Sequence, residues 1–190
     1  MSSMAVVPTS PPPSVRLATA ADVPGIAEVH VRAWQRAYAG IVPADHLDSL
    51  DVSVRAQQLS RRFGPDAVSG TVPTLVATGS DDTDGAVLGF VNAGPYREDD
   101  VPADGPCWGE IYAIYVHPDH WSRGVGRALF DAALATLDAD RTIVLWVLEA
   151  NANARRFYER MGFTPDGATS VFEVAGTEIL EVRYRRDPVT

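Results

Sequence analysis

Two glycines and two arginines follow the most strand-like run of the sequence. The run from Glu110 to Val116 is rich in β-branched and aromatic residues, and Gly124 and Gly126 open a segment with helical periodicity. A helix N-terminus carries about half a positive charge, and its unpaired backbone N–H groups bind phosphate without a lysine. Glycines let the backbone approach a ligand, and Arg123 and Arg127 can add charge-assisted hydrogen bonds. The segment therefore predicts a site for a phosphorylated ligand.

Two other phosphate-binding folds fit this segment less well. The dinucleotide fingerprint GxGxxG matches its first two glycines, but Leu129 stands at the third position and the loop before Gly124 is too long for the required tight turn. The Walker motif needs a Gly-Lys-Ser/Thr ending, and the chain contains no lysine, so that motif is excluded. A third interpretation is that the glycines only begin a helix. The flanking segments favour a binding site.

The elements that would position this loop follow from hydrophobic periodicity and from glycine and proline breaks. Asp22 is the expected N-cap of the first helix. The pattern predicts strands at 15–18, 74–78, 86–93, 110–116, 142–148, 164–173 and 178–184, and helices at 22–39, 44–62 (in one or two pieces), 124–138 and 151–161. The order predicts an α/β (α+β) fold with a mixed, mostly antiparallel seven-stranded sheet and helices on both faces.

Length and composition limit the class of protein. A chain of 190 residues is the size of one domain, expected over 14–187 after a disordered N-terminal tail at 1–13. The net charge of −9 argues against a nucleic-acid partner, and no apolar run is long enough to predict a membrane span. The tail does not read as a secretory signal, and the chain has one cysteine, Cys107, so we expect a cytoplasmic protein.

Two separated motifs resemble the GCN5-related N-acetyltransferase (GNAT) superfamily. The first is EIYAIYVHPDHWSRGVGRALF, which spans the strand and the glycine loop, and the second is NANARRFYERMGF further downstream. The resemblance covers the order of elements from about Val15 to Arg186. It implies the GNAT fold, acetyl-CoA as acetyl donor and an amine as acceptor.

The resemblance also implies which residues bind the cofactor. The strand end would pair its backbone with the pantetheine arm, the loop amides would hold the pyrophosphate, and an asparagine of the second motif would contact the pantetheine region. Trp121 departs from the family pattern, because glutamine or arginine is usual there. The implied cofactor-binding residues are Ile114, Tyr115, Val116, Ser122, Arg123, Gly124, Val125, Gly126, Arg127 and Asn151.

Acetyl transfer to an amine needs a neutral nitrogen and an acid for the leaving thiolate. We expect Glu110 to be the general base: it lies six residues before Val116, as in the histone-acetyltransferase branch, and alternation puts it on one strand face with Tyr112, Ile114 and Val116. Tyr158 matches the tyrosine that many members place beside the cofactor sulfur, and we expect it to protonate the thiolate. The structural alternatives are a solvated strand start for Glu110 and a core aromatic for Tyr158.

The sequence says less about the residues that bind the acceptor. Trp34 and Tyr38 lie four residues apart on the first helix, which in this family helps to roof the acceptor cleft, so we expect them to bind an aromatic or cationic amine unless they only pack the core. Cys107 has no evident paired base, which disfavours a covalent nucleophile. His117 and His120 lack a third ligand cluster, so we expect no metal.

These features predict transfer of acetyl from acetyl-CoA to a primary amine of a small molecule or peptide, by direct attack in a ternary complex. The alternative is a non-catalytic acyl-CoA-binding regulatory protein. Nicotinamide binding is a weaker alternative, and a homodimer is an open prospect. The sequence does not identify the acceptor.

Overall fold

Seven strands form one sheet in the computed structural model, which describes residues 13–63, 72–79, 85–97, 108–137 and 141–188. The order is β1-β2-β3-β4-β5-β7-β6, and every neighbouring pair is antiparallel except β4 with β5. This confirms the predicted mixed, mostly antiparallel sheet. The strands are β1 (Ser14–Leu17), β2 (Thr74–Thr78), β3 (Val87–Pro95), β4 (Gly109–Val116), β5 (Ile143–Leu148), β6 (Thr164–Val174) and β7 (Thr177–Arg186).

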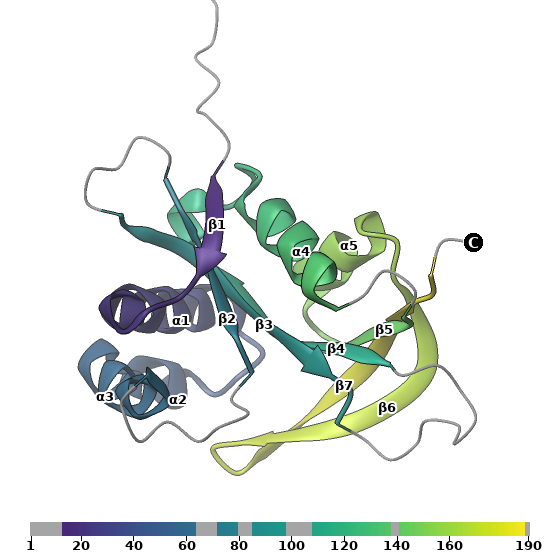
Figure 1. Cartoon of the computed structure of the whole chain (residues 1–190). Helices are drawn as coiled ribbons and strands as arrows, with labels where there is room; N and C mark the ends of the chain where they lie inside the picture. Colours follow the sequence, from purple (N-terminus) through teal and green to yellow (C-terminus); the bar gives the residue numbers. More distant parts are fainter. Residues whose placement is uncertain (1–12, 64–71, 80–84, 98–107, 138–140, 189–190) are drawn as a thin grey trace, which may run out of the picture.

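Helices cover both faces of the sheet, as predicted (Figure 1). On one face lie α1 (Val23–Ala37), α2 (Ala44–Ser49) and α3 (Val52–Phe63), and on the other lie α4 (Val125–Thr136) and α5 (Ala152–Arg160). Two short 3-10 turns, η1 (Ala20–Asp22) and η2 (Pro118–His120), precede α1 and α4. Apart from Pro13, the tail expected at 1–13 lies outside the described residues.

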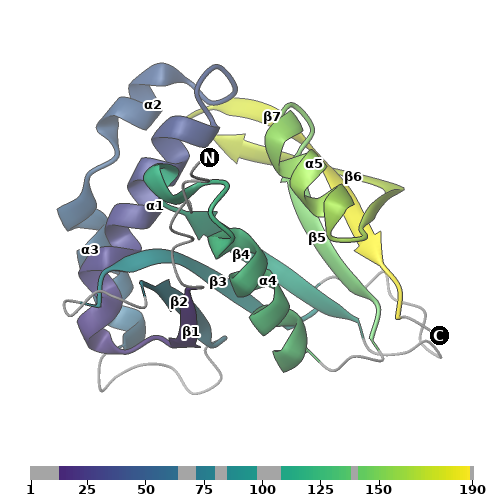
Figure 2. The same ribbon diagram turned by 90° about the horizontal axis from the view of Figure 1, so that it is seen from above.

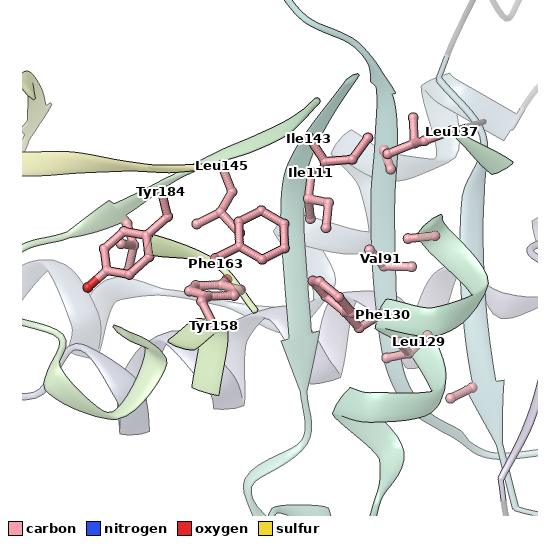
Figure 3. Close-up of a cluster of buried hydrophobic side chains, with 14 of the residues drawn as sticks. Val91, Ile111, Leu129, Phe130, Leu137, Ile143, Leu145, Tyr158, Phe163 and Tyr184 are labelled. Carbon is pink, nitrogen blue, oxygen red and sulfur yellow. The ribbon is translucent and has the colours of Figure 1, made fainter. Parts of the chain in front are cut away.

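The main core joins α4 and α5 to the sheet (Figure 3). Phe130 of α4 is 1% exposed and packs edge-to-face against Phe157 and Phe163, with ring centroids 6.1 and 5.5 Å away. Tyr184 of β7 is fully buried, and its hydroxyl donates to Glu159 and accepts from Arg155 Nε. These contacts fix the two helices that flank the glycine loop.

The side chain of Asp22 does not cap α1, contrary to the prediction. Its carboxylate turns back to accept the Thr19 backbone N–H at 2.7 Å and pairs with both terminal nitrogens of Arg16 at 2.8 and 2.7 Å. The Arg16 guanidinium lowers the pKa of Asp22 to about 2. The chain therefore uses Asp22 to tie β1 to the start of α1.

His30 should make the protein less stable in mild acid. Burial, followed by the charge of Arg55, lowers the pKa of His30 to about 3, so the unfolded chain binds a proton more readily than the folded one. Stability should therefore fall by about 1.4 kcal/mol per pH unit as pH drops below about 6.5. Chemical denaturation at pH 4.5 to 6.5 measures this slope, and His30→Phe, which keeps the ring stacking, should flatten it. An unchanged slope in the variant would contradict the assignment.

Candidate active site

The sheet opens between β4 and β5, and a cleft occupies the opening. The two strands pair only at Gly109 with Ile143 and at Glu110 with Val144. Beyond these pairs they diverge (Figure 2), and a cleft of about 850 Å³ is lined by both strands, by α1, by the loop before α4 and by α5. Unpaired strand backbone offers N–H and C=O groups to a ligand. The edge of β4 beyond Glu110 is therefore open to an extended ligand.

The glycine loop forms one wall of this cleft at the N-terminus of α4. Gly124 has a φ of 84° and Ser122 a φ of 61°, so both adopt the left-handed backbone that costs a non-glycine residue about 1 to 2 kcal/mol. No side chain caps α4 at Gly124, which leaves the first-turn N–H groups for a ligand. A Cβ at Gly126 would lie 3.4 Å from the Phe157 ring, which is an ordinary contact distance, so the start of α4 packs beside α5. The arrangement is an anion site made of backbone amides.

Only some of the loop residues predicted to bind the cofactor line the cleft. Trp121 donates its indole N–H to the Val116 carbonyl at 2.8 Å and thereby ties the loop to the end of β4. Arg127 donates to the Asp131 carboxylate at 2.7 Å. Ser122, Gly124, Gly126 and Arg127 line the cleft with Trp121, whereas Arg123 and Val125 are not among the lining residues.

A β-bulge changes which residues of β4 share a face. Asn92 pairs with Ala113 and Ala93 with Ile111, so Tyr112 is an extra residue in the strand. Ile114 and Val116 pack with the α4 core, together with Ile111, whereas Tyr115 packs with the α1 core. The expectation that Glu110 and Tyr112 share a face with Ile114 and Val116 is therefore wrong, because simple alternation does not anticipate the bulge. All three residues from Ile114 to Val116 line the cleft.

Glu110 is held in an ion pair. It is 2% exposed, and both carboxylate oxygens accept from Arg97, at 2.6 and 3.1 Å. It is not one of the residues that line the cleft. The Glu110 carboxylate is therefore not solvated in the way expected for a simple strand start. It is also not free to take a proton from a substrate in the cleft while it is paired with Arg97.

Three phenols gather on the floor of the cleft. Tyr38, Tyr115 and Tyr158 all line it. Burial raises the pKa of each, and the mutual influence of the three hydroxyls raises the pKa of Tyr38 and Tyr158 further. A phenol with a raised pKa stays protonated, so Tyr158 can act as a proton donor over the ordinary pH range.

Aromatic rings and one carboxylate form another part of the cleft wall. Trp34 packs edge-to-face on Tyr38, with centroids 4.9 Å apart, and on Phe172 of β6, with centroids 6.3 Å apart. Glu181 of β7 also lines the cleft, and burial followed by the charge of Glu110 raises its pKa. Sequence reasoning missed Glu181. The sequence signal that could have found it is its spacing: Glu181 lies two residues after the apolar Ile179 on a strand, so the two side chains are expected on the same face of the sheet.

Asn151 lines the cleft and begins α5. Its side-chain oxygen accepts the Ala154 backbone N–H at 3.1 Å, so this oxygen serves as the helix cap. Cys107 lies outside the described residues. Within the described ranges, no three His, Cys, Asp or Glu side chains gather as a metal site would require. Among those same residues, no helix has the length and apolar character needed to cross a bilayer.

Comparison with known proteins identifies the family. Residues 50–163 match the model of the acetyltransferase (GNAT) family. The chain is 32% identical to an uncharacterized N-acetyltransferase of Bacillus subtilis, YuaI, over 89% of this chain and 90% of the relative. It is 26% identical to a probable N-acetyltransferase of Mycobacterium tuberculosis, Rv2775, over 90% and 91% of the two chains.

The fold has close counterparts among solved structures. YncA of Salmonella typhimurium, a putative acetyltransferase solved with acetyl-CoA, superposes with a TM-score of 0.60 at 21% identity, over 92% of this chain and 93% of that one. Family model and relatives together make this protein an acetyl-CoA-dependent N-acetyltransferase. The chain belongs to the acetyltransferase (GNAT) family.

Proposed function

We propose that the protein transfers the acetyl group of acetyl-CoA to a primary amine of a small molecule or peptide, by direct attack in a ternary complex. The observation that carries the proposal is one continuous cleft that joins the amide-lined loop, the open edge of β4 and the buried hydroxyl of Tyr158. A single cleft of this kind lets donor and acceptor meet without a covalent enzyme intermediate. Bound acetyl-CoA supplies the activated thioester carbonyl.

Different residues would then bind the cofactor and take part in the proton transfers. The uncapped amides between Ser122 and Arg127 would hold the pyrophosphate, and the β4 backbone from Ile114 to Val116 would pair with the pantetheine arm. Asn151 would border that arm, and Tyr158 would protonate the leaving thiolate. The ion pairs and hydrogen bonds that occupy Arg127 and Trp121 favour backbone amides over side chains as the main phosphate contacts.

Glu110 remains the base predicted from the sequence, and it would have to act from outside the cleft wall. Its ion pair with Arg97 must open, or a water must relay the proton, before it can take one from an amine. Glu110→Gln in the activity assay compares this role with the candidate inside the cleft that is argued below.

A CoA-release assay across small amines, aminoglycosides, amino acids and peptide N-termini tests the proposed function. We expect turnover with at least one class, and thermal stabilisation by CoA and acetyl-CoA. Stabilisation without turnover on any acceptor would favour the regulatory acyl-CoA-binding alternative. Stabilisation by NAD(P) and not by CoA would overturn the proposal. A cytoplasmic location and a homodimer remain predictions that fractionation and light scattering can check.

A further inference from the structure

Glu181 of β7 is an acidic residue in the wall of the cleft. Among the described residues that line the cleft, it is the only carboxylate, whereas arginines line the cleft from α1, α4 and α5. It pairs across the sheet with Leu148 and Ser170. Paired residues and residues two apart share a sheet face, so Glu181 lies on the same face as Phe172 and Ile179. Glu181 therefore supplies the negative side chain among these lining residues, next to the aromatic Phe172 of its own sheet face.

The environment of Glu181 suits a group that exchanges a proton with an amine. The side chain is half-buried, and burial followed by the nearby charge of Glu110 raises its pKa. Glu181 in turn contributes to the raised pKa values of Tyr38 and Tyr115, which line the same cleft. An ammonium ion placed there would relieve the desolvation of the carboxylate.

The walls around Glu181 are apolar. Trp34, Tyr38 and Phe172 pack with Leu148 and Ile179 in one cluster, and the Trp34 ring lies edge-to-face with both other rings. Aromatic faces attract ammonium groups and accommodate hydrocarbon. No arginine lines the cleft from β6 or β7 among the described residues. Arg36 of α1 does line it, but this exposed residue is two positions from both Trp34 and Tyr38 and so lies on the other side of the helix from their shared face.

We propose that Glu181, Trp34, Tyr38 and Phe172 form the acceptor subsite, which selects a monoamine with an apolar body and holds its nitrogen at the Glu181 carboxylate. The inference rests on the proposed acetyltransferase function and assigns its substrate class. A carboxylate next to the amine would meet Glu181 as a like charge. A second ammonium at the far end of the acceptor would find no second carboxylate among the described residues that line the cleft.

Glu181 then serves as the proton acceptor of the reaction. The substrate ammonium gives one proton to the Glu181 carboxylate, and the freed lone pair forms the C–N bond at the thioester carbonyl. The C–S bond breaks, and Tyr158 protonates the departing thiolate. The second proton of the attacking nitrogen returns to Tyr158, directly or through water, and Glu181 releases its proton to solvent. The sum is an amide, CoA and one proton.

Matched acceptors test the substrate class with the full chain. We expect kcat/KM for 2-phenylethylamine to exceed that for phenylalanine, which adds a carboxylate beside the amine, by about 10-fold or more. Pentylamine should likewise exceed 1,5-diaminopentane, which adds a second ammonium. Equal values or a reversed order in either pair would overturn the inference. Acetylation of peptides or aminoglycosides alone would contradict the monoamine class but leave the proposed acetyltransferase function intact. No turnover on any acceptor would count against both the substrate class and the proposed function.

Variants on one strand test the role of Glu181. Loss of a proton acceptor should lower kcat/KM of Glu181→Gln about 100-fold with 2-phenylethylamine, with acetyl-CoA stabilisation unchanged and partial recovery in Glu181→Asp. Glu178→Gln is the control, because Glu178 is an exposed residue of the same strand and the substitution is the same. Wild-type activity in Glu181→Gln, or an equal loss in Glu178→Gln, would overturn the role. A larger loss of kcat/KM in Glu110→Gln than in Glu181→Gln would instead assign the role of proton acceptor to Glu110.

Discussion

Tyr158→Phe is expected to lower kcat about 100-fold or more, while the stabilisation of the protein by acetyl-CoA stays the same. The ring of Tyr158 is buried beside Phe157 and Phe163, so phenylalanine fills the same space and removes only the hydroxyl. Without that donor the thiolate must leave unprotonated. The raised pKa of Tyr158 further implies that the wild-type enzyme keeps this proton donor well above neutral pH.

Tyr184→Phe is the matched control for that experiment. Tyr184 lies in the same cluster, with its ring centroid 6.5 Å from that of Tyr158, but its hydroxyl bonds Arg155 and Glu159 and not the cleft. Its loss should lower the melting temperature and leave kcat close to wild type. Single-turnover measurements with saturating acetyl-CoA separate the chemical step from binding. Full activity in Tyr158→Phe would remove Tyr158 from the mechanism and leave it a core aromatic.

Phe130→Ala should cost about 3 to 5 kcal/mol of unfolding free energy, the range for a buried aromatic replaced by alanine. Phe130 stands between Phe157 of α5 and Phe163, which directly precedes β6, so its removal opens a cavity where α4, α5 and the sheet meet. Urea unfolding at neutral pH measures the change. Leu17→Ala, at a side chain that is 61% exposed, is the control and should change stability by less than about 0.5 kcal/mol. A loss below about 1 kcal/mol in Phe130→Ala would show that the core collapses to fill the space.

Local signals in the sequence were enough for most of the fold. β2 spans the residues expected for this strand, Thr74–Thr78, and the second helical region, expected in one or two pieces, is divided into α2 and α3. The glycine loop was also predictable, because an anion site of backbone amides needs only a strand, a glycine turn and a helix in succession. These features depend on neighbours in the chain.

The parts that sequence reasoning missed depend on residues far apart in the chain. Glu181 reaches the cleft because β7 inserts between β5 and β6, which periodicity along one strand cannot reveal. The ion pair of Glu110 requires Arg97, which lies thirteen residues earlier, just after the end of β3. The bulge at Tyr112 inverts the face of every preceding residue of β4 relative to those after it, and no residue type announces it.

The short seam between β4 and β5 has a mechanical consequence. Only two residue pairs join these strands, whereas eight pairs join β6 to β7. A small rotation of one half of the sheet against the other would therefore disturb few ladder hydrogen bonds, and it would change the width of the cleft between the two strands. Compliance of this kind would let one backbone accommodate proposed acceptors of different girth, and the charge and ring chemistry of the walls would then decide which of them react.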